Sequence, residues 1–227
     1  MQRVVLAWSG GKDSLMALEA LREGLDLEVF GLLTTVTGAY DRVSMHGVQR
    51  SLLHRQARAL GLPLFEVSLS PQSSNSEYEQ KMGEVLTELK AQGVKAIAFG
   101  DLFLADIRAY RERMLQGIGL KGLFPLWGRH TTALARDFIR RGHRSIVVCV
   151  DSKALPSSFA GRVYDEPFLR ELPAPVDPCG ENGEFHTFAF DGPLFISPVA
   201  FRKGDVVERE GFVFCDLIPT EEGGGVL

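Results

Sequence analysis

Runs of apolar residues alternate with helix-like patterns over the first 150 residues of the chain. Five of these runs are aliphatic or β-branched almost throughout, so both of their faces are expected to be buried, as in a strand of a parallel sheet. The runs are Arg3–Trp8, Leu27–Thr35, Pro63–Ser68, Val94–Gly100 and Ser145–Val150. We interpret each of them as a buried strand of one parallel sheet.

The segments between the runs place apolar residues three or four positions apart, which is the spacing of one helix face. Gly61 and Gly142 follow two of these stripes, at positions where helices commonly end. The clearest stripes are Leu15, Leu18 and Leu21; Leu53, Ala57 and Leu60; Met82, Val85, Leu86 and Leu89; and Leu134, Phe138 and Ile139. Buried strands separated by helices predict an α/β fold with a doubly wound parallel sheet.

The pattern changes after Val150, where prolines become frequent and the helical spacing fades. Short strands are predicted at Phe185–Phe190, Leu194–Ser197 and Phe212–Leu217. We therefore predict a nucleotide-binding domain over residues 1–135, with its boundary between 125 and 150, and a smaller C-terminal α+β domain over residues 136–220. The glycine-containing tail, residues 221–227, is predicted to be disordered.

The composition is that of an ordinary soluble globular protein, with 45% hydrophobic and 24% charged residues among 227. A net charge of −4 provides no general basic field for binding nucleic acid. Cys149, Cys179 and Cys215 form no C-x-x-C pair, so neither a disulfide framework nor a zinc site is predicted. The sequence shows no signal peptide and no apolar stretch of membrane-spanning length. We expect a cytoplasmic protein.

The segment Ser9–Ser14 reads SGGKDS and lies between the first strand and the first helix. Two glycines let the backbone approach an anion, and the N-terminus of the helix adds positive potential. The segment lacks the glycine spacing of a Walker A loop and has Asp13 where that loop has Ser or Thr. We predict a phosphate site to which every residue of the segment contributes: Ser9, Gly10, Gly11, Lys12, Asp13 and Ser14.

A strand, SGGKDS and a helix in this order resemble the PP-loop of the N-type ATP pyrophosphatases. The resemblance implies a HUP-type sheet of five parallel strands and ATP bound with Mg²⁺, for which Asp13 is the implied ligand. It also implies that ATP is cleaved between the α- and β-phosphates, releasing AMP and pyrophosphate. By the same analogy, adenosine lies near Ala7 and Trp8 and near Thr34, after the second strand.

A second motif, Glu181–Thr187, holds two carboxylates, an imidazole and a hydroxyl within one short segment. Such a set can orient an amine, accept its proton or bind Mg²⁺, although a solvated turn between strands has a similar composition. We predict that Glu181, Glu184 and His186 are catalytic residues of the acceptor half of the site. Lys12 and Asp13 are the predicted catalytic residues of the nucleotide half.

Together with Gly100-Asp101, Pro125–Trp127 and Asp191–Phe195, these motifs resemble the diphthine–ammonia ligase family from Leu6 to about Phe195. That family adenylates a carboxylate of diphthine on elongation factor 2, and ammonia then displaces AMP to leave an amide. The resemblance implies an AMP-forming amide ligase that uses ATP and ammonia or another amine. It also suggests that Gly180–Thr187 faces the PP-loop across an interdomain cleft.

Two residues depart from the family motif E-G-G-E-x-E-T: Asn182 replaces its middle glycine and His186 replaces its third glutamate. The acceptor molecule is therefore left open, and so is the oligomeric state, a homodimer included. Imidazole titrates near neutral pH, so we expect His186 to take the extra proton from the amine.

Four further positions are candidates with a structural alternative. His46 is predicted to contact the nucleotide or the acceptor, or else to be a solvated or helix-capping residue. Gly100 and Asp101 end a strand at the edge where α/β sheets bind ligands, so Asp101 serves Mg²⁺ or ribose, or else caps a helix. Cys179 is a nucleophile or a packing residue. One predicted helix also carries a basic face that is solvated or receives an acidic substrate: Arg108, Arg111 and Arg113.

Two other functions compete with the ligase. A tRNA thiolase of the PP-loop superfamily commonly needs paired cysteines, which this chain lacks. A non-catalytic ATP-binding protein needs neither SGGKDS nor the acid-rich second motif. Lys12 and Asp13 are expected at a solvent-facing turn, so Lys12→Ala is predicted to change the free energy of unfolding by less than about 1 kcal/mol.

Overall fold

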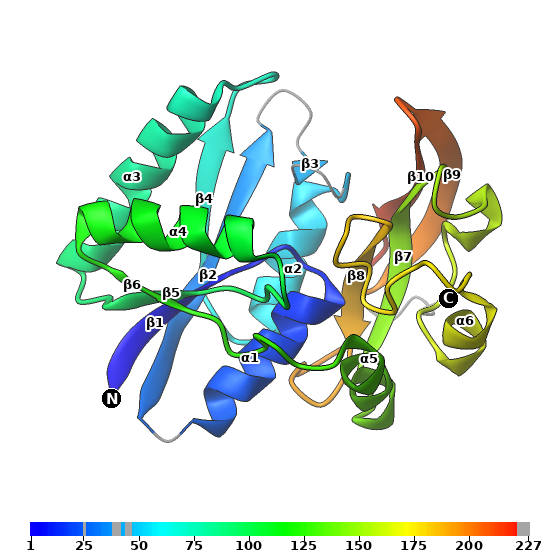
Figure 1. The fold of residues 1–227 in the computed structure, drawn as a ribbon, viewed down its shortest axis with the longest axis horizontal. Helices are drawn as coiled ribbons and strands as arrows, with labels where there is room; N and C mark the ends of the chain where they lie inside the picture. The colour runs from blue at the N-terminus through cyan, green and yellow to red at the C-terminus, as the bar shows by residue number, and fades with distance from the viewer. Residues whose placement is uncertain (25, 38–41, 44–46, 222–227) are drawn as a thin grey trace. The chain divides into compact units, whose positions relative to one another are not determined.

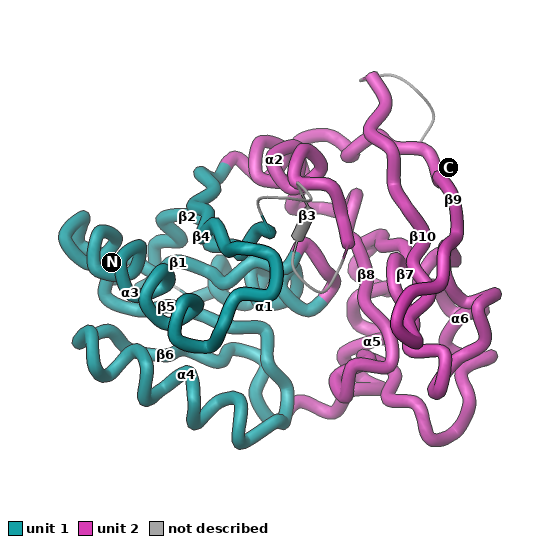
Figure 2. The backbone as a smooth tube through the Cα atoms, turned by 90° about the horizontal axis from the view of Figure 1, so that it is seen from above, with its two compact units in different colours: residues 1–9, 13–44, 62–128 teal, residues 10–12, 45–61, 129–227 magenta. Residues whose placement is uncertain are grey.

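The computed structural model describes residues 1–24, 26–37, 42–43 and 47–221, which form two compact units (Figure 2). Neither unit is one continuous stretch of chain. Unit 1 comprises Met1–Ser9, Asp13–Ser44 and Leu62–Gly128, and unit 2 comprises Gly10–Lys12, Met45–Gly61 and Arg129–Leu227. Three residues of the glycine-rich turn therefore belong to the same unit as the C-terminal part of the chain.

Unit 1 contains a parallel sheet, visible in Figure 1. Strand β2 pairs in parallel with both β1 and β4, β1 pairs with β5, and β5 pairs with β6, while the short β3 is antiparallel to β2. The strands are β1 (Gln2–Ala7), β2 (Leu27–Thr37), β3 (Arg42–Val43), β4 (Leu64–Leu69), β5 (Ala96–Ala98) and β6 (Lys121–Leu123). The helices that belong with them are α1 (Lys12–Glu23), α3 (Asn75–Ala91) and α4 (Ala105–Ile118).

Helices α3 and α4 cover one face of this sheet and contact each other (Figure 1). Right-handed crossovers require this arrangement, because α3 and α4 both connect strands in the same direction across the sheet. Apolar residues from both helices and from β1, β2, β4 and β5 form the core beneath them: Val5, Leu33, Val67, Met82, Leu86, Leu89, Ile97, Phe99 and Leu115. The parallel α/β class predicted from the sequence is thereby confirmed.

Unit 2 contains a separate four-stranded antiparallel sheet with the order β8-β7-β10-β9, so β8 and β9 are its edges. Its strands are β7 (Arg144–Asp151), β8 (Phe185–Asp191), β9 (Phe201–Arg209) and β10 (Phe212–Pro219). Its helices are α2 (Arg50–Ala59), α5 (Thr131–Arg140) and α6 (Glu166–Glu171), with a 3-10 turn at Ser157–Phe159. Aromatic rings fill its interior, among them Tyr164, Phe168 and Phe185, whose centroids lie 5.3 to 6.0 Å apart.

Two sequence-based expectations about strands are wrong, and strands β6 and β9 were not predicted. Ser145–Val150 is a strand, but as part of β7 it belongs to the antiparallel sheet, and β6 supplies the fifth parallel strand. An apolar run indicates that a strand is buried, but it does not indicate in which sheet the strand lies. Strand β6 was not predicted because it is too short to form such a run. Leu194–Ser197 is not a strand. Strand β9 was missed because almost all of its side chains are exposed and many are charged.

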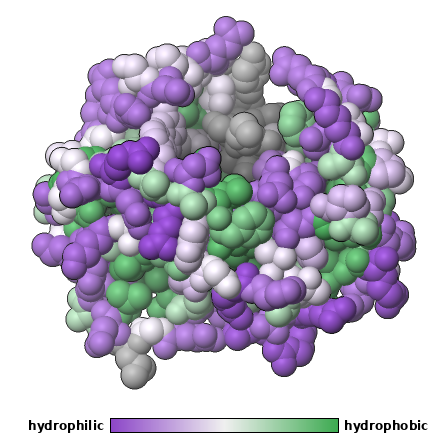
Figure 3. Space-filling model, in the orientation of Figure 1, coloured by the Kyte–Doolittle hydropathy of each residue, from purple (hydrophilic) through white to green (hydrophobic). Residues whose placement is uncertain are grey.

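Hydrophilic side chains cover most of the face drawn in Figure 3, and hydrophobic side chains form smaller patches between them. Among the helices of the described residues, none combines the length and the apolar character needed to cross a membrane.

Candidate active site

The glycine-rich turn follows β1, as predicted, and leads into α1 at Lys12. Asp13 lies in the first turn of this helix, where the helix dipole favours a negative charge. In unit 1, the Ser9 Oγ and Ser14 Oγ atoms lie 3.3 Å apart. The two hydroxyl groups that flank the glycines therefore lie side by side at the start of α1.

The end of β5 approaches the start of α1 very closely. A Cβ atom on Gly100 would lie 3.0 Å from the carbonyl oxygen of Asp13 and 3.2 Å from the Ser14 nitrogen. These contacts are tighter than most Cβ contacts in proteins, so a side chain at this position would push against the backbone of α1. The role of Gly100 is to bring Asp101 beside the first turn of α1.

Asp101 is a largely buried carboxylate with an incomplete set of partners. Its Oδ2 atom lies 3.3 Å from Arg111 Nε, outside hydrogen-bond geometry, and no described residue donates a hydrogen bond to it. Burial raises the pKa of Asp101; Arg111 opposes this shift and the charge of Asp13 adds to it. Each carboxylate disfavours the ionisation of the other. A bound cation would offset this repulsion.

We expect Asp101→Asn to raise the melting temperature at pH 7 while lowering activity. Because its folded-state pKa is raised, Asp101 contributes stability when protonated and loses that contribution as pH rises. The neutral amide therefore removes a destabilising charge near neutral pH. Thermal melting across pH tests this, because the gain should vanish as pH falls toward about 3.9, the pKa of an unfolded Asp. A variant that melts below the parent at pH 7 would contradict the assignment.

The other nucleotide contacts implied by the sequence have mixed outcomes. Trp8 and Thr34 are buried in unit 1. Thr34 lies within β2, which continues to Thr37, and not after the strand as expected. His46 lies outside the described residues.

Lys12 is the part of the turn that departs most from expectation. It is only 3% exposed, not solvent-facing, and its Nζ atom donates a hydrogen bond to the Cys179 carbonyl. The ammonium group lies 5.5 Å from the centre of the Tyr164 ring and 5.4 Å from that of Phe185. The expected solvent-facing position of Lys12 is therefore wrong, and the expectation that Lys12→Ala would leave stability nearly unchanged loses its basis.

The backbone of the turn also contacts the second motif. The Lys12 amide donates to Thr187 Oγ1 at 3.0 Å, and the Ala189 amide donates to the Gly10 carbonyl at 2.8 Å. All of these residues belong to unit 2. Thr187 of the second motif therefore contacts the turn at Lys12, and Ala189, two residues beyond the motif, contacts it at Gly10.

Glu184 organises the loop that carries the second motif. The residue is 8% exposed, and its carboxylate accepts hydrogen bonds from the backbone amides of Asp177 and Asn182 and from the Asn182 side chain, each at 3.0 Å. Asp177 Oδ1 in turn accepts from the amides of Cys179 and Glu181 at 2.9 and 3.4 Å. Glu184 thus holds the loop whose Cys179 carbonyl binds Lys12.

His186 and Thr187 lie on opposite faces of β8. Side chains alternate along a strand, so Thr187 shares a face with Phe185, while His186 and Phe188 share the other. Both His186 and Glu181 are partly exposed. Of the second motif, Thr187 contacts the glycine-rich turn, and the side chain of His186 points the other way.

Two weaker candidates have structural roles. Arg108 stacks on Phe124 and Trp127, with its Cζ atom 4.7 Å from each ring centre, and it pairs with Glu112. Cys179 is buried, and its thiol lies 3.4 Å from the Thr131 carbonyl, as expected of a packing residue.

Sequence reasoning missed Gln56, which is fully buried. Its Nε2 atom donates to the Gly10 carbonyl at 2.8 Å and to the Ala189 carbonyl at 2.6 Å. The available signal was its position, because Gln56 is a polar residue within the apolar stripe formed by Leu53, Ala57 and Leu60.

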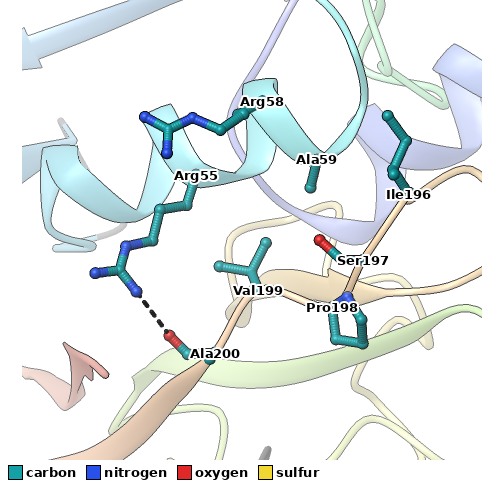
Figure 4. A pocket seen from close by; sticks show the side chains of 8 residues that line it. All are labelled: Arg55, Arg58, Ala59, Ile196, Ser197, Pro198, Val199 and Ala200. Atoms are coloured by element: carbon teal, nitrogen blue, oxygen red, sulfur yellow. Dashed lines mark hydrogen bonds between the residues drawn. The ribbon is translucent and has the colours of Figure 1, made fainter. Parts of the chain in front are cut away.

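A pocket of about 260 Å³ lies elsewhere in unit 2, between α2 and the segment that precedes β9 (Figure 4). Its lining consists of Arg55, Arg58, Ala59 and residues 196–200. Arg55 donates to the Ala200 carbonyl at 3.5 Å and also to the Thr220 carbonyl. None of the predicted site residues lines this pocket.

Comparison with known proteins supports the family inferred from the motifs. Residues 1–122 match the diphthamide synthase N-terminal domain, and residues 130–215 match the diphthamide synthase C-terminal domain.

Curated relatives are similar over almost the whole chain. A diphthine–ammonia ligase from Homo sapiens is 26% identical over 95% of this chain and 88% of its own length. The Mus musculus enzyme of the same name is 25% identical with the same coverage. The one from Danio rerio is 29% identical over 95% of this chain and 92% of its own length. With both domain matches in sequence order and the glycine-rich turn in place, this chain belongs to the diphthamide synthase family.

Proposed function

We propose that this chain is an ATP-dependent amide ligase that cleaves ATP to AMP and pyrophosphate and joins ammonia or another amine to an adenylated carboxylate. The observation that carries the proposal is the SGGKDS turn between β1 and α1, whose Lys12 donates its amide to Thr187 of the second motif and its Nζ to the Cys179 carbonyl. The names of the relatives, diphthine–ammonia ligase, agree with this chemistry. The acceptor need not be diphthine, because Asn182 and His186 depart from the family motif.

In the proposed site, the glycine-rich turn and the Ser9 and Ser14 hydroxyls bind the pyrophosphate portion of ATP. Backbone amides at the start of α1 suit an anion, and the two hydroxyls lie together at this point. The adenosine would lie near Trp8 and Thr34. In this assignment the turn binds the nucleotide, and the second motif assists the attack of the amine on the adenylated carboxylate.

Asp13 and Asp101 are the residues that would hold Mg²⁺. The effect of Asp13 on the pKa of Asp101, and the buried Oδ2 atom without a hydrogen-bond donor, both fit a hard cation. In residues 1–24, 26–37, 42–43 and 47–221 no group of three or more His, Cys, Asp or Glu side chains is arranged for a metal. Phosphate oxygens and water would therefore complete the coordination. When bound, Mg²⁺ would neutralise charge on the phosphates.

Lys12 is assigned to the acceptor side as well as to the turn. Its ammonium group holds the Cys179 carbonyl, so it fixes the second-motif loop beside the glycines. Glu181 and His186 remain the proposed groups that receive the amine and take its proton, because both are partly exposed. Glu184 supports them by holding the loop.

The cysteines favour the ligase over the thiolase. All three are buried and none forms a disulfide. Burial raises the pKa of Cys149 to about 12 and raises that of Cys215 above its ordinary value. Thiols that resist ionisation are poor sulfur carriers. They also agree with a reducing compartment, and we propose the cytoplasm.

Product analysis tests the proposal directly. The purified protein, incubated with ATP, Mg²⁺, an ammonium salt and candidate carboxylate acceptors, is expected to release AMP and pyrophosphate in equal amounts. Chromatography separates AMP from ADP. Accumulation of ADP and phosphate would refute the proposal, whereas acceptor-dependent AMP would support it.

A further inference from the structure

The glycine-rich turn lies along the free edge of a sheet. Strand β8 is an edge of the unit 2 sheet, so its outward amides and carbonyls need partners that no strand provides. At Ala189, the amide donates to the Gly10 carbonyl at 2.8 Å, and the carbonyl accepts from Gln56 Nε2 at 2.6 Å. The turn and one side chain of α2 together satisfy the outward backbone groups of the edge strand at Ala189.

Gln56 is matched to this position. Its Nε2 atom has two protons, and both are used, one on the Gly10 carbonyl and one on the Ala189 carbonyl. The side chain is fully buried, so water cannot replace either bond. Gly10 has a φ of +80°, and a Cβ atom there would lie 2.9 Å from Gln56 Oε1. The glycine and the glutamine therefore fit each other.

The hydrogen bonds to the Gly10 carbonyl fix the orientation of the peptide group that joins Gly10 to Gly11. In a trans peptide the carbonyl and the following N–H point in opposite directions, and the group is planar. Holding the Gly10 carbonyl toward β8 therefore turns the Gly11 N–H away from β8. The Thr187 hydroxyl fixes the next amide, that of Lys12, from the same strand.

We propose that Gln56 is a positioning residue of the nucleotide site, which sets the Gly10–Gly11 peptide plane and thereby the conformation in which the glycine-rich turn binds the pyrophosphate portion of ATP. This inference rests on the proposed function. Gln56 does not touch the nucleotide and acts only through the turn. Its effect should therefore depend on the phosphates of the ligand and not on the adenosine.

Calorimetric titration of Gln56→Leu with ATP and with AMP, each in the presence of Mg²⁺, tests the inference. Leucine keeps the volume and removes both donors. We expect ATP affinity to fall by about 10- to 100-fold, as for loss of one oriented bond to a charged group, while AMP affinity changes by less than about 2-fold. Thr187→Val, which removes only the acceptor for the Lys12 amide, is expected to act in the same direction and guards against misfolding of the first variant.

Gln80→Leu is the matched control, because Gln80 is an exposed glutamine whose amide donates to Glu84 at 3.1 Å. It should bind both nucleotides like the parent. Equal ATP affinity in Gln56→Leu and the parent would overturn the inference, and so would equal losses for ATP and AMP. Failure of the parent itself to bind ATP would overturn the proposed function and this inference with it.

Discussion

Replacing Lys12 with methionine is expected to reduce amide formation at least about 100-fold and to lower the free energy of unfolding by about 2 kcal/mol. The ammonium group is almost fully buried, donates to the Cys179 carbonyl and lies over two aromatic rings. Methionine fills a similar volume but leaves a buried carbonyl without its donor. Denaturant unfolding and a steady-state assay measure the two effects.

Lys121→Met is a suitable control, because Lys121 is an exposed lysine on β6. It should behave like the parent in both experiments. If Lys12→Met were as stable as Lys121→Met, the buried contacts of Lys12 would carry no energy. In that case the structural part of its role would have to be abandoned.

Glu184→Ala is expected to cost about 2 to 4 kcal/mol of stability and to abolish transfer to the acceptor. The substitution removes one carboxylate that accepts three hydrogen bonds and leaves the donors of Asp177 and Asn182 unpaired. The loop would then lose the conformation in which it presents Glu181. Binding of ATP should fall less than transfer does, because the loop contacts the turn through the backbone carbonyl of Cys179, which the substitution leaves in place.

Glu184→Gln provides the internal comparison, since glutamine keeps one acceptor oxygen in nearly the same shape. We expect an intermediate loss of both stability and transfer. Calorimetry with ATP and an acceptor-transfer assay on both variants separate loop support from direct catalysis. A fully stable Glu184→Ala that still lacks transfer would show that the carboxylate acts on the substrate and not on the loop.

Local patterns predicted well those features that local forces decide. The order of β1, turn and α1 follows from an apolar run, two glycines and a helical stripe, and all are present. Strands β8 and β10 were found by their aromatic and aliphatic residues. Gly61 ends α2 with a φ of +68°, as its place after the stripe predicted.

Features that depend on distant partners were not predictable in this way. Lys12 reads as a surface residue because lysine beside glycine usually is one, and only a loop 167 residues later buries it. In the sequence, Gln56 is only a polar interruption of an apolar stripe. Its role depends on the Gly10 and Ala189 carbonyls, to which it donates hydrogen bonds and which local patterns do not identify. The sequence of β7 indicates that the strand is buried. The sheet to which it belongs is determined by β8 and β10, which follow it in the chain.

The pairing of the glycine-rich turn with β8 has a consequence for how the protein is made. The Lys12 amide and its partner Thr187 are 175 residues apart in the chain. At a synthesis rate of about 5 to 20 residues per second, the turn leaves the ribosome roughly 10 to 35 s before the strand that completes it. Prematurely terminated chains would carry the entire SGGKDS sequence. They would lack the Cys179 carbonyl, the Thr187 hydroxyl and the edge of β8, which hold the turn in its conformation. Such fragments should be unable to hydrolyse ATP, so incomplete synthesis would not release an uncoupled ATPase into the cell.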